Sequence, residues 1–392
     1  MTDDSQSPPP GSFGSCRSVE AFEKLNRLGE GTYGTVYRAR DRDTGQIVAL
    51  KKLRVHGEKE GFPRSSLREI RLLHGLRHTN IVELREVACG RRPGSVFLVF
   101  EYCEHDVGAL LDLMERPFSQ AEVKCLVLQL VRAVDRLHAS FVIHRDIKLS
   151  NILLTNKGVL KLADFGLARE FKEPPEPSTT NVVTLWYRSP ELLLGTRTYT
   201  TAVDIWSIGC NFGELLNKKP LLPGKAEEHQ VSLICQLLGT PSEKIWPGVE
   251  ELPLFQRYTL QCSGYYNNLA VKFPHAAESC LELLNKMLTF NPGKRATAPD
   301  CLAHWYFTDA PSPQEPQWMP TWREHRNQMA NPRALGPAQP RPMEHNILDY
   351  VRGLKRCGST EDLACGAKRP AATLAARSAL LAATKKIKSS IF

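Results

Sequence analysis

The sequence predicts an α+β fold with two unlike lobes, because strand patterns dominate its first part and helical patterns dominate the rest. From residue 22 to residue 103 the apolar residues mostly follow strand patterns, with one helical pattern among them. After residue 103 they recur at helical spacing. The length of 392 residues suits two lobes with tails better than one ordinary domain. We expect the lobes to join near residues 101–106.

The individual elements are expected in a definite order along the chain. Residues 1–21, rich in Ser, Pro and Gly, are expected to form a disordered lead-in. Pro63 suits the first turn of a helix, and Thr44-Gly45 suits a turn between strands. The sequence predicts two strands within 22–40, further strands at 46–53, 81–89 and 95–102, and helices at 64–76, 121–141, 202–217, 226–238 and 278–289. The expected domains are an N-lobe at 22–103, a C-lobe at 104–308 and a C-terminal extension at 309–392.

Most of the net charge lies in that extension. The chain carries +9, and residues 330–392 hold eleven Lys or Arg against four acids, which is +7 of the total. The extension is therefore basic, and we expect disorder beyond about residue 330. The body is near neutral, so nucleic-acid binding is not expected, except weakly through the tail.

Two basic clusters in the tail, Lys368-Arg369-Pro370 and Lys385-Lys386-Ile387-Lys388, predict a bipartite nuclear localisation signal. Their spacer is longer than usual, and a solvated tail is the alternative. We expect a protein of the nucleus and cytoplasm, with the nucleus favoured.

Composition argues against several other classes of protein. No run of 18 apolar residues is present, so no membrane span is expected. The N-terminus lacks the basic start and apolar stretch of a signal peptide, which favours cytosol or nucleus. The eleven cysteines are odd in number and include no C-x-x-C pair, so neither a disulfide framework nor a zinc site is indicated.

A glycine-rich run lies between the first two strand patterns: Gly29-Glu30-Gly31-Thr32-Tyr33-Gly34-Thr35-Val36. Glycines there let backbone N–H groups close over phosphates without interference from Cβ atoms. Such a run is also common in plain hairpins and in dinucleotide-binding units, where a helix follows the glycines directly. Here a strand follows, which favours a hairpin that covers nucleotide phosphates.

Lys51 ends the strand segment Val48-Ala49-Leu50-Lys51. A lysine on a buried strand is costly unless it is paired, although a strand-end lysine can also simply reach solvent. The glycine-rich run upstream favours contact with the α- and β-phosphates. Glu69, in the next predicted helix, is the expected partner of Lys51, although a lone helical glutamate is more often solvated.

A second motif, His144-Arg145-Asp146-Ile147-Lys148-Leu149-Ser150-Asn151, carries the groups that phosphoryl transfer requires. Asp146 is expected to accept or orient the proton of a substrate hydroxyl, and Lys148 to offset the charge of the γ-phosphate. Asn151 and Asp164 offer the oxygen ligands that Mg²⁺ prefers. The segment between them reads as a hairpin, which brings both to its open end. Short pieces such as His144-Arg145-Asp146 or Asp164-Phe165-Gly166 occur by chance, whereas the glycine-rich run, Lys51 and these two motifs in this order are specific.

At these residues the chain resembles the eukaryotic protein kinase family, over roughly residues 20–308. The resemblance implies a two-lobed fold: an N-lobe with an antiparallel β-sheet plus one helix, and a mainly helical C-lobe. In that family Glu191 pairs with Arg295, and Asp204 caps the backbone of the catalytic loop. Ser189, in Ser189-Pro190-Glu191, replaces the usual Ala.

Within that family the chain resembles the cyclin-dependent kinases, on GEGTYG (29–34), PRSSLRE (63–69), VVTLWYRSPELLLG (182–195) and LLGTPSEKIWPG (237–248). The PISSLRE type is most similar and the PITSLRE type is second. The resemblance implies a Ser/Thr kinase of cell-cycle or transcription-related regulation that uses ATP and Mg²⁺. It also implies a cyclin on the 63–69 helix, of the M type if the first subgroup holds. Arg64 stands where those relatives carry an apolar Ile.

The resemblance also implies nucleotide contacts by match. Adenine is expected between apolar side chains, with a bulky residue behind it, backbone groups beside it and a carboxylate at the ribose. The apolar side chains are Leu28, Val36, Ala49 and Leu153, and the bulky residue is Phe100. The backbone groups belong to Glu101 and Cys103, and the carboxylate belongs to Asp106. Each apolar one would singly be read as ordinary core. Thr184 is expected to bridge Asp146 and Lys148.

Regulation is implied in the same way. Thr179 stands at the activating-phosphate position, with Ser178 and Thr180 beside it. A dianionic phosphate there would draw together the cationic side chains of Arg68, Arg145 and Arg169. Phosphates on Thr32 or Tyr33 would obstruct ATP. Val183 and Arg188 fall where the family shapes a pocket for Pro after the phosphoacceptor.

Two rival functions remain from the sequence. One is a kinase-fold scaffold without catalysis, but such proteins usually lose the counterparts of Lys51, Asp146 or Asp164, and this chain keeps all three. The other is nucleic-acid binding through the basic tail. Neither rival explains the whole set of motifs.

Overall fold

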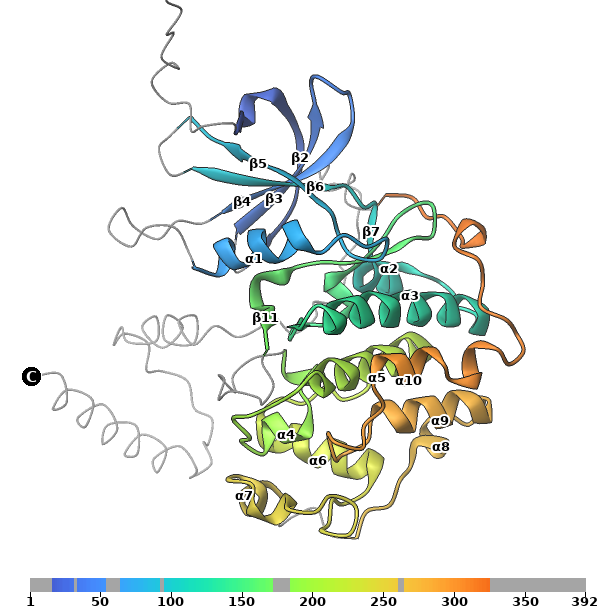
Figure 1. The fold of residues 1–392 in the computed structure, drawn as a ribbon. Helices are drawn as coiled ribbons and strands as arrows, with labels where there is room; N and C mark the ends of the chain where they lie inside the picture. Colours follow the sequence, from blue (N-terminus) through green and yellow to red (C-terminus); the bar gives the residue numbers. More distant parts are fainter. Residues whose placement is uncertain are drawn as a thin grey trace, which may run out of the picture. The chain divides into compact units, whose positions relative to one another are not determined.

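The computed structural model describes residues 16–31, 34–53, 64–91, 95–171, 184–259 and 264–324, and every structural statement below refers to these. All of them belong to the first of two compact units of the chain, residues 1–332. The predicted α+β organisation is confirmed: a sheet with one helix comes first and a helical part follows (Figure 1).

The N-terminal part contains a sheet of six described strands in the order β1-β5-β6-β4-β3-β2. Their bounds are β1 Arg17–Ser18, β2 Phe22–Gly31, β3 Gly34–Asp41, β4 Ile47–Leu53, β5 Leu84–Cys89 and β6 Val96–Glu101. Every pair is antiparallel, as predicted, except β1, which runs parallel to β5. The helix α1 (Arg64–Gly75) lies against the sheet on the side of the helical part (Figure 1).

The expected disordered lead-in, 1–21, is corrected at its end. Strand β1 and a short 3-10 helix at Val19–Ala21 are ordered there. Arg17 explains why, because its guanidinium meets Asp41 of β3 at 2.9 Å and Glu86 of β5 at 2.8 Å. The local composition of residues 1–21 could not indicate these two partners, because both lie much later in the sequence.

The C-terminal part is mainly helical. Its helices are α2 Val107–Leu113, α3 Gln120–Ala139, α4 Pro190–Leu193, α5 Ala202–Asn217, α6 Glu227–Leu238, α7 Phe255–Thr259, α8 Leu269–Lys272, α9 Glu278–Met287 and α10 Ala298–Leu302. The predicted longer helices agree with these bounds to within two residues at each end. None of the described helices is long and apolar enough to cross a membrane.

Two small sheets lie beside these helices. Their strands are β7 His105–Asp106, β8 Val142–Ile143, β9 Ile152–Leu154, β10 Leu160–Leu162 and β11 Arg169–Glu170. The predicted hairpin is β9–β10, which pairs with β7 to give the order β10-β9-β7, and β11 pairs with β8. Backbone hydrogen bonding joins the two ends of the hairpin, since Ala163 N–H donates to Asn151 O at 2.9 Å.

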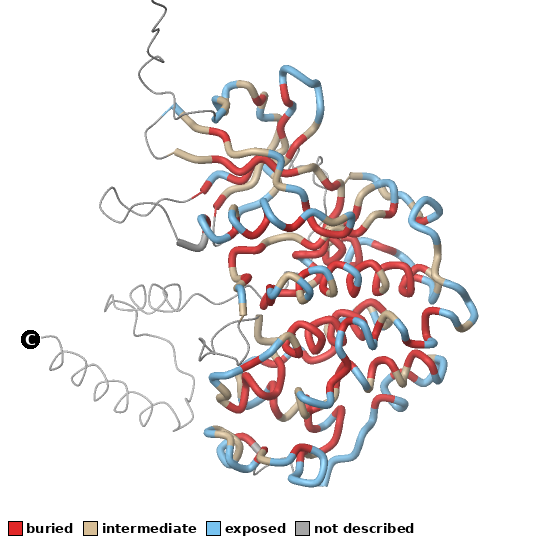
Figure 2. Tube along the Cα trace, in the orientation of Figure 1, coloured by how far each residue is buried: buried red, intermediate tan, exposed pale blue. Residues whose placement is uncertain are grey.

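The adjacent helices α3 and α5 form the centre of the core (Figure 2). Helix α3 begins with a capping box, in which Ser119 N–H donates to the Glu122 carboxylate at 2.7 Å and Glu122 N–H donates back to the Ser119 hydroxyl. Helix α5 is buried along most of its length, including Trp206 at 0% exposure. This rigid pair supports the loop between β8 and β9, which carries the candidate site.

Candidate functional site

Lys51 of β4 lies at the centre of a buried ionic cluster. Its Nζ is 2.7 Å from Glu69 Oε1 on α1 and 3.2 Å from Asp164 Oδ1. Burial alone would lower the pKa of Lys51, but the two carboxylates outweigh it and raise that pKa. Burial would likewise raise the pKa of Asp164, and Lys51 more than offsets it, so that pKa is lowered. Strand, helix and Asp164 are thus held together by one ammonium group.

Asp164 has a left-handed backbone, with φ of 63°. The next residue, Phe165, is completely buried, and its ring meets the ring of His144 edge-to-face with centroids 4.9 Å apart. Burial of Phe165 therefore fixes the direction of the Asp164 carboxylate.

Asp146 lies in a closed set of hydrogen bonds. Asn151 Nδ2 donates to Asp146 Oδ2 at 3.0 Å. The Thr184 hydroxyl donates to Asp146 Oδ1 at 3.0 Å and accepts from Lys148 Nζ at 3.0 Å. Lys148 Nζ is also 3.2 Å from Asp146 Oδ2. Thr184 lies between Asp146 and Lys148, where the family resemblance had put it.

Asp204 of α5 anchors the loop that carries Asp146. Its carboxylate, at 0% exposure, accepts backbone N–H groups of His144 and Arg145, both at 2.9 Å. His138 Nε2 of α3 lies 3.0 Å from the same carboxylate. Burial would raise the pKa of Asp204, but these hydrogen bonds and the nearby imidazoles lower it, so the group stays ionised.

A second buried ion pair stabilises the segment after Thr184. Both Nη atoms of Arg295 donate to the carboxylate of Glu191, each at 2.8 Å. The two side chains are 0% and 2% exposed. Arg295 also donates to the Ala202 and Phe290 carbonyls, so its guanidinium group bonds several separate segments. Such a bidentate, hydrogen-bonded pair tolerates burial well.

The predicted glycine-rich run forms the turn end of the β2–β3 hairpin. Gly29 lies opposite Val36, Glu30 opposite Thr35 and Gly31 opposite Gly34, and the predicted Thr32 and Tyr33 lie outside the described residues. Among the six described positions of this run, Glu30 forms an ion pair with the neighbouring Arg27. A Cβ on Gly34 would lie 1.9 Å from the carbonyl oxygen of Lys52, so close strand packing requires glycine there.

The predicted adenine-lining side chains share an intermediate burial. They come from four strands: Leu28 on β2, Val36 on β3, Ala49 on β4 and Leu153 on β9. Ordinary core residues on the same strands, such as Leu50, are fully buried. Apolar side chains of intermediate burial, drawn from two different sheets, are consistent with the lining of an apolar ligand site.

The segment that joins the two parts of the molecule carries the remaining nucleotide predictions. Phe100 lies opposite Ala49 and is buried. The backbone N–H of Glu101 donates to Glu83 O at 3.1 Å, so that donor is not available to a base. Cys103 is buried. Asp106 caps α2 by accepting Ala109 N–H at 2.6 Å, a structural role that the sequence did not indicate.

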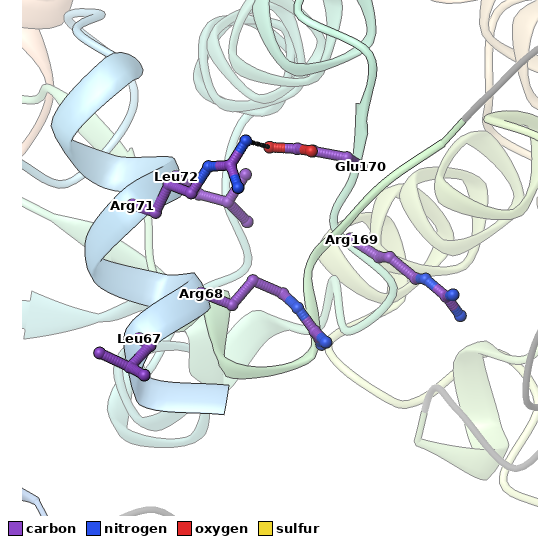
Figure 3. A pocket seen from close by; sticks show the side chains of 6 residues that line it. All are labelled: Leu67, Arg68, Arg71, Leu72, Arg169 and Glu170. Carbon is purple, nitrogen blue, oxygen red and sulfur yellow. Dashed lines mark ion pairs between the residues drawn. The ribbon is translucent and has the colours of Figure 1, made fainter. Parts of the chain in front are cut away.

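The three predicted phosphate-binding arginines are only partly brought together. Arg68 of α1 and Arg169 of β11 line one pocket of about 350 Å³, together with Leu67, Arg71, Leu72 and Glu170 (Figure 3). Arg68 extends toward the segment that carries Arg169, whose own side chain points away from α1.

The third arginine, Arg145, is absent from that lining and is 4% exposed. Its Nε donates to Leu167 O at 2.7 Å and its Nη1 donates to the Tyr199 hydroxyl at 2.6 Å. The predicted Thr179 lies outside the described residues.

Sequence reasoning missed several contacts around the site. Arg71 joins Glu170 at 3.5 Å across the pocket of Figure 3. Arg188, expected in a substrate pocket, bonds Glu227 Oε1 at 2.6 Å, and Val183 lies outside the described residues. These partners lie far apart in the sequence, so no local pattern could have indicated them.

Comparison with known proteins gives one family. The model of the family described as "Protein kinase domain" matches residues 22–307. The chain is 58% identical over 325 residues to cyclin-dependent kinase 10 from Bos taurus and from Homo sapiens, covering 83% of this chain and 90% of each relative. It is 50% identical over 326 residues to cyclin-dependent kinase 11B from Homo sapiens, covering 83% of this chain and 41% of that protein.

Proposed function

Since this chain belongs to the protein kinase family, as a cyclin-dependent Ser/Thr protein kinase, we propose that Asp146, Lys148 and Thr184 serve its phosphoryl transfer from ATP. The observation that carries the proposal is the hydrogen-bonded set in which Thr184 lies between Asp146 and Lys148. It places a carboxylate and an ammonium group side by side at one point, which the transfer of a charged group from a nucleotide to a hydroxyl requires.

The roles of these groups follow from their charges. Asp146 orients the Ser or Thr hydroxyl of a protein substrate and accepts its proton as the hydroxyl oxygen bonds to the γ-phosphorus. The bond from that phosphorus to the β–γ bridging oxygen breaks, and ADP leaves. Lys148 offsets the negative charge on the transferred group, and Thr184 holds the Asp146 and Lys148 side chains in their relative positions through its two hydrogen bonds.

A second group of residues is proposed to hold the phosphates and the metal ion. Lys51, kept in place by Glu69, contacts the α- and β-phosphates. Asn151 Nδ2 donates to Asp146, so the amide oxygen of Asn151 points in another direction. The lowered pKa of Asp164 keeps its carboxylate ionised. These two hard oxygen ligands fit Mg²⁺, which takes few protein ligands and completes its shell with phosphate and water. When bound, the ion neutralises phosphate charge and orients the γ-phosphoryl group.

The base is proposed to bind among the half-buried side chains of Leu28, Val36, Ala49 and Leu153. Phe100 closes the back, Cys103 and the Glu101 carbonyl face the base edge, and Asp106 meets the ribose. The glycine-rich hairpin, Gly29 to Val36, covers the phosphates.

Regulation is proposed to act through a phosphate on Thr179. Arg68 and Arg169 already line one pocket beside α1, and such a site takes an anion with several oxygens. Recruitment of Arg145 would require its guanidinium to use N–H groups other than the two that bond Leu167 O and the Tyr199 hydroxyl. Thr179→Ala should lower the activity of the cyclin complex, and unchanged activity would sink this assignment. Phosphates on Thr32 and Tyr33 are proposed to obstruct ATP.

A cyclin and protein substrates are the partners that its relatives imply. We propose that the cyclin binds α1 and the 63–69 segment, where Leu67 is 53% exposed on the helix, and that it is of the M type. Ser/Thr-Pro sites are the proposed substrates, and the tail is proposed to favour the nucleus. Deleting residues 368–388 from a fluorescent fusion and imaging its nuclear fraction tests the last point.

The experiment that tests the site is a Mg-ATP assay of the complex pulled down from cells, with Asp164→Asn as its partner variant. We expect the wild type to phosphorylate substrate and the variant to lose at least about a hundredfold in rate, because its metal ligand loses charge. Equal phosphorylation by both proteins would contradict the assignment.

A further inference from the structure

Residues 309–324, which we call the strap, lie beyond the part of the chain that the kinase family model matches. The strap follows α10 and rises beside α3 toward β7 (Figure 1). Its start is tied to α3, since Lys124 Nζ donates to Asp309 O at 2.7 Å. Further on, Gln314 N–H donates to Ala121 O at 2.9 Å. The strap therefore has a fixed course along α3.

The middle of the strap packs against the β9–β10 hairpin. A Cβ on Gly158, in the turn of that hairpin, would lie 1.8 Å from the carbonyl oxygen of Pro316. Met319 is 4% exposed and belongs to the main core. The close backbone approach at Gly158 shows that the strap is part of the packed structure.

The end of the strap meets the segment that joins the two lobes. The Trp322 ring lies edge-to-face with Phe118 at 5.9 Å and with His105 at 6.2 Å between centroids. His105 directly precedes Asp106, the proposed ribose ligand, and three residues separate it from Glu101. Trp322 therefore packs against the joining segment, next to the proposed ribose ligand.

Glu324 extends this contact to the N-terminal sheet. Its Oε2 accepts the Tyr102 hydroxyl at 3.3 Å and lies 3.8 Å from Arg38 Nη2 on β3. The Arg38 guanidinium also lies over the Tyr102 ring, 5.3 Å from its centroid. The carboxylate thus joins a strand of the N-lobe, the joining segment and the strap.

We propose that Trp322 and Glu324 are positioning residues for the nucleotide, so that ATP affinity depends on a strap outside the kinase domain. The inference rests on the proposed ATP site. The base would bind between β3, β4 and the segment 101–106, and its affinity depends on how rigidly these are held before binding. Trp322 and Glu324 touch that segment and β3 without reaching the transferred phosphate, so they act on binding and leave chemistry unchanged.

Kinetics of the full chain with its cyclin test this separation. Glu324→Gln keeps the shape and removes the charge, and we expect the KM for ATP to rise about two- to fivefold, as for a partly exposed ion pair. Trp322→Ala removes both ring contacts and should raise it about tenfold. In both variants kcat should stay within about twofold. Glu315→Gln is the matched control, because Glu315 lies exposed on the strap and its carboxylate accepts from Gln317 Nε2 within the strap, so the KM of this variant should not change.

A structural brace alone predicts another result: a lower melting temperature with an unchanged KM for ATP in both variants, and that result overturns the inference. Arg38→Met combined with Glu324→Gln sharpens the test. If the two side chains act as one contact, the double variant raises KM no more than the larger single effect, whereas multiplied effects refute the contact.

Titration calorimetry of Mg-ADP binding separates this inference from the proposed function. A wild-type complex that binds no Mg-ADP overturns both. Binding by the wild type, with equal affinity in the Glu324→Gln and Trp322→Ala variants, overturns the role of the strap alone. Weaker binding in those two variants, with the Glu315→Gln control unchanged, supports it.

Discussion

Replacing Asp204 with Asn should loosen the loop that carries Asp146 without changing the chemical identity of any reacting group. The wild-type carboxylate accepts two backbone N–H groups at 2.9 Å and lies 3.0 Å from His138 Nε2. Asn offers one acceptor oxygen and turns an NH₂ group toward at least one of those donors. A buried N–H is then left unmet, and a charge-assisted hydrogen bond is lost.

The magnitude follows from these two losses. An unmet buried donor costs about 1–3 kcal/mol, and a hydrogen bond to a charged group contributes about 1.5–3 kcal/mol. Since the two overlap, we expect the free energy of unfolding to fall by about 2–4 kcal/mol. A displacement of Asp146 of about 1 Å lowers kcat by roughly a hundredfold.

The assay pairs urea unfolding with kcat of the cyclin complex and uses Asp300→Asn as control. Asp300 accepts the N–H and hydroxyl of Thr297 in an exposed capping box, far from the loop in sequence. This control should lose about 1 kcal/mol of stability and no activity. The reasoning is refuted if Asp204→Asn keeps the kcat of the wild type.

Acidity gives a second readout for the same residue. The folded-state pKa of Asp204 is lowered, so its contribution to stability is full above the unfolded pKa of about 3.9. It is lost as the pH falls through the folded pKa. Wild type and Asp204→Asn should therefore differ most near neutral pH and converge in strong acid. A gap that stays constant down to pH 2 would contradict the assigned ionisation.

Three further outcomes are expected. A Cβ on Gly34 would lie 1.9 Å from a backbone oxygen of β4, whereas a Cβ on Gly29 meets nothing within 4 Å. In urea titrations, Gly34→Ala should therefore lower the free energy of unfolding by about 1–3 kcal/mol, and Gly29→Ala by less than about 1 kcal/mol. Arg295→Lys cannot keep the two-pronged contact with Glu191 and should cost about 3–5 kcal/mol by the same method. Hydrogen bonds from its arginine partner lower the pKa of Asp41 to about 2, so the urea midpoints of wild type and Asp41→Asn should differ at about pH 6 and converge near pH 2.

The sequence was most informative where the chemistry is local. Asp146, Lys148 and Asn151 lie within six residues, so their spacing alone indicates a shared site. The hairpin pattern between Asn151 and Asp164 also predicts that these two residues meet. The pairing of Lys51 with Glu69 was expected because a buried ammonium group needs a partner, and the family resemblance supplied which one.

Contacts between distant segments could not be predicted in this way. Arg17 is held by two strands far along the chain, which orders a segment whose composition favours disorder. Glu324 reaches Tyr102 across 222 positions, and no periodicity connects them. Arg145 has a motif-based role as a phosphate ligand, but the Tyr199 hydroxyl, 54 positions away, takes one of its donors. In each case a polar group found its partner through tertiary packing, which one-dimensional spacing does not encode.

Phosphate transfer by the cyclin complex of Asp146→Asn tests the central claim most directly. The variant keeps the size of the side chain, and its amide oxygen can still accept from Asn151 or Thr184, so binding of Mg-ADP should stay close to that of the wild type. Removing the proton acceptor should lower the rate of phosphate incorporation into substrate by about 10²- to 10⁴-fold. An Asp146→Asn complex that transfers phosphate at the wild-type rate would contradict the account.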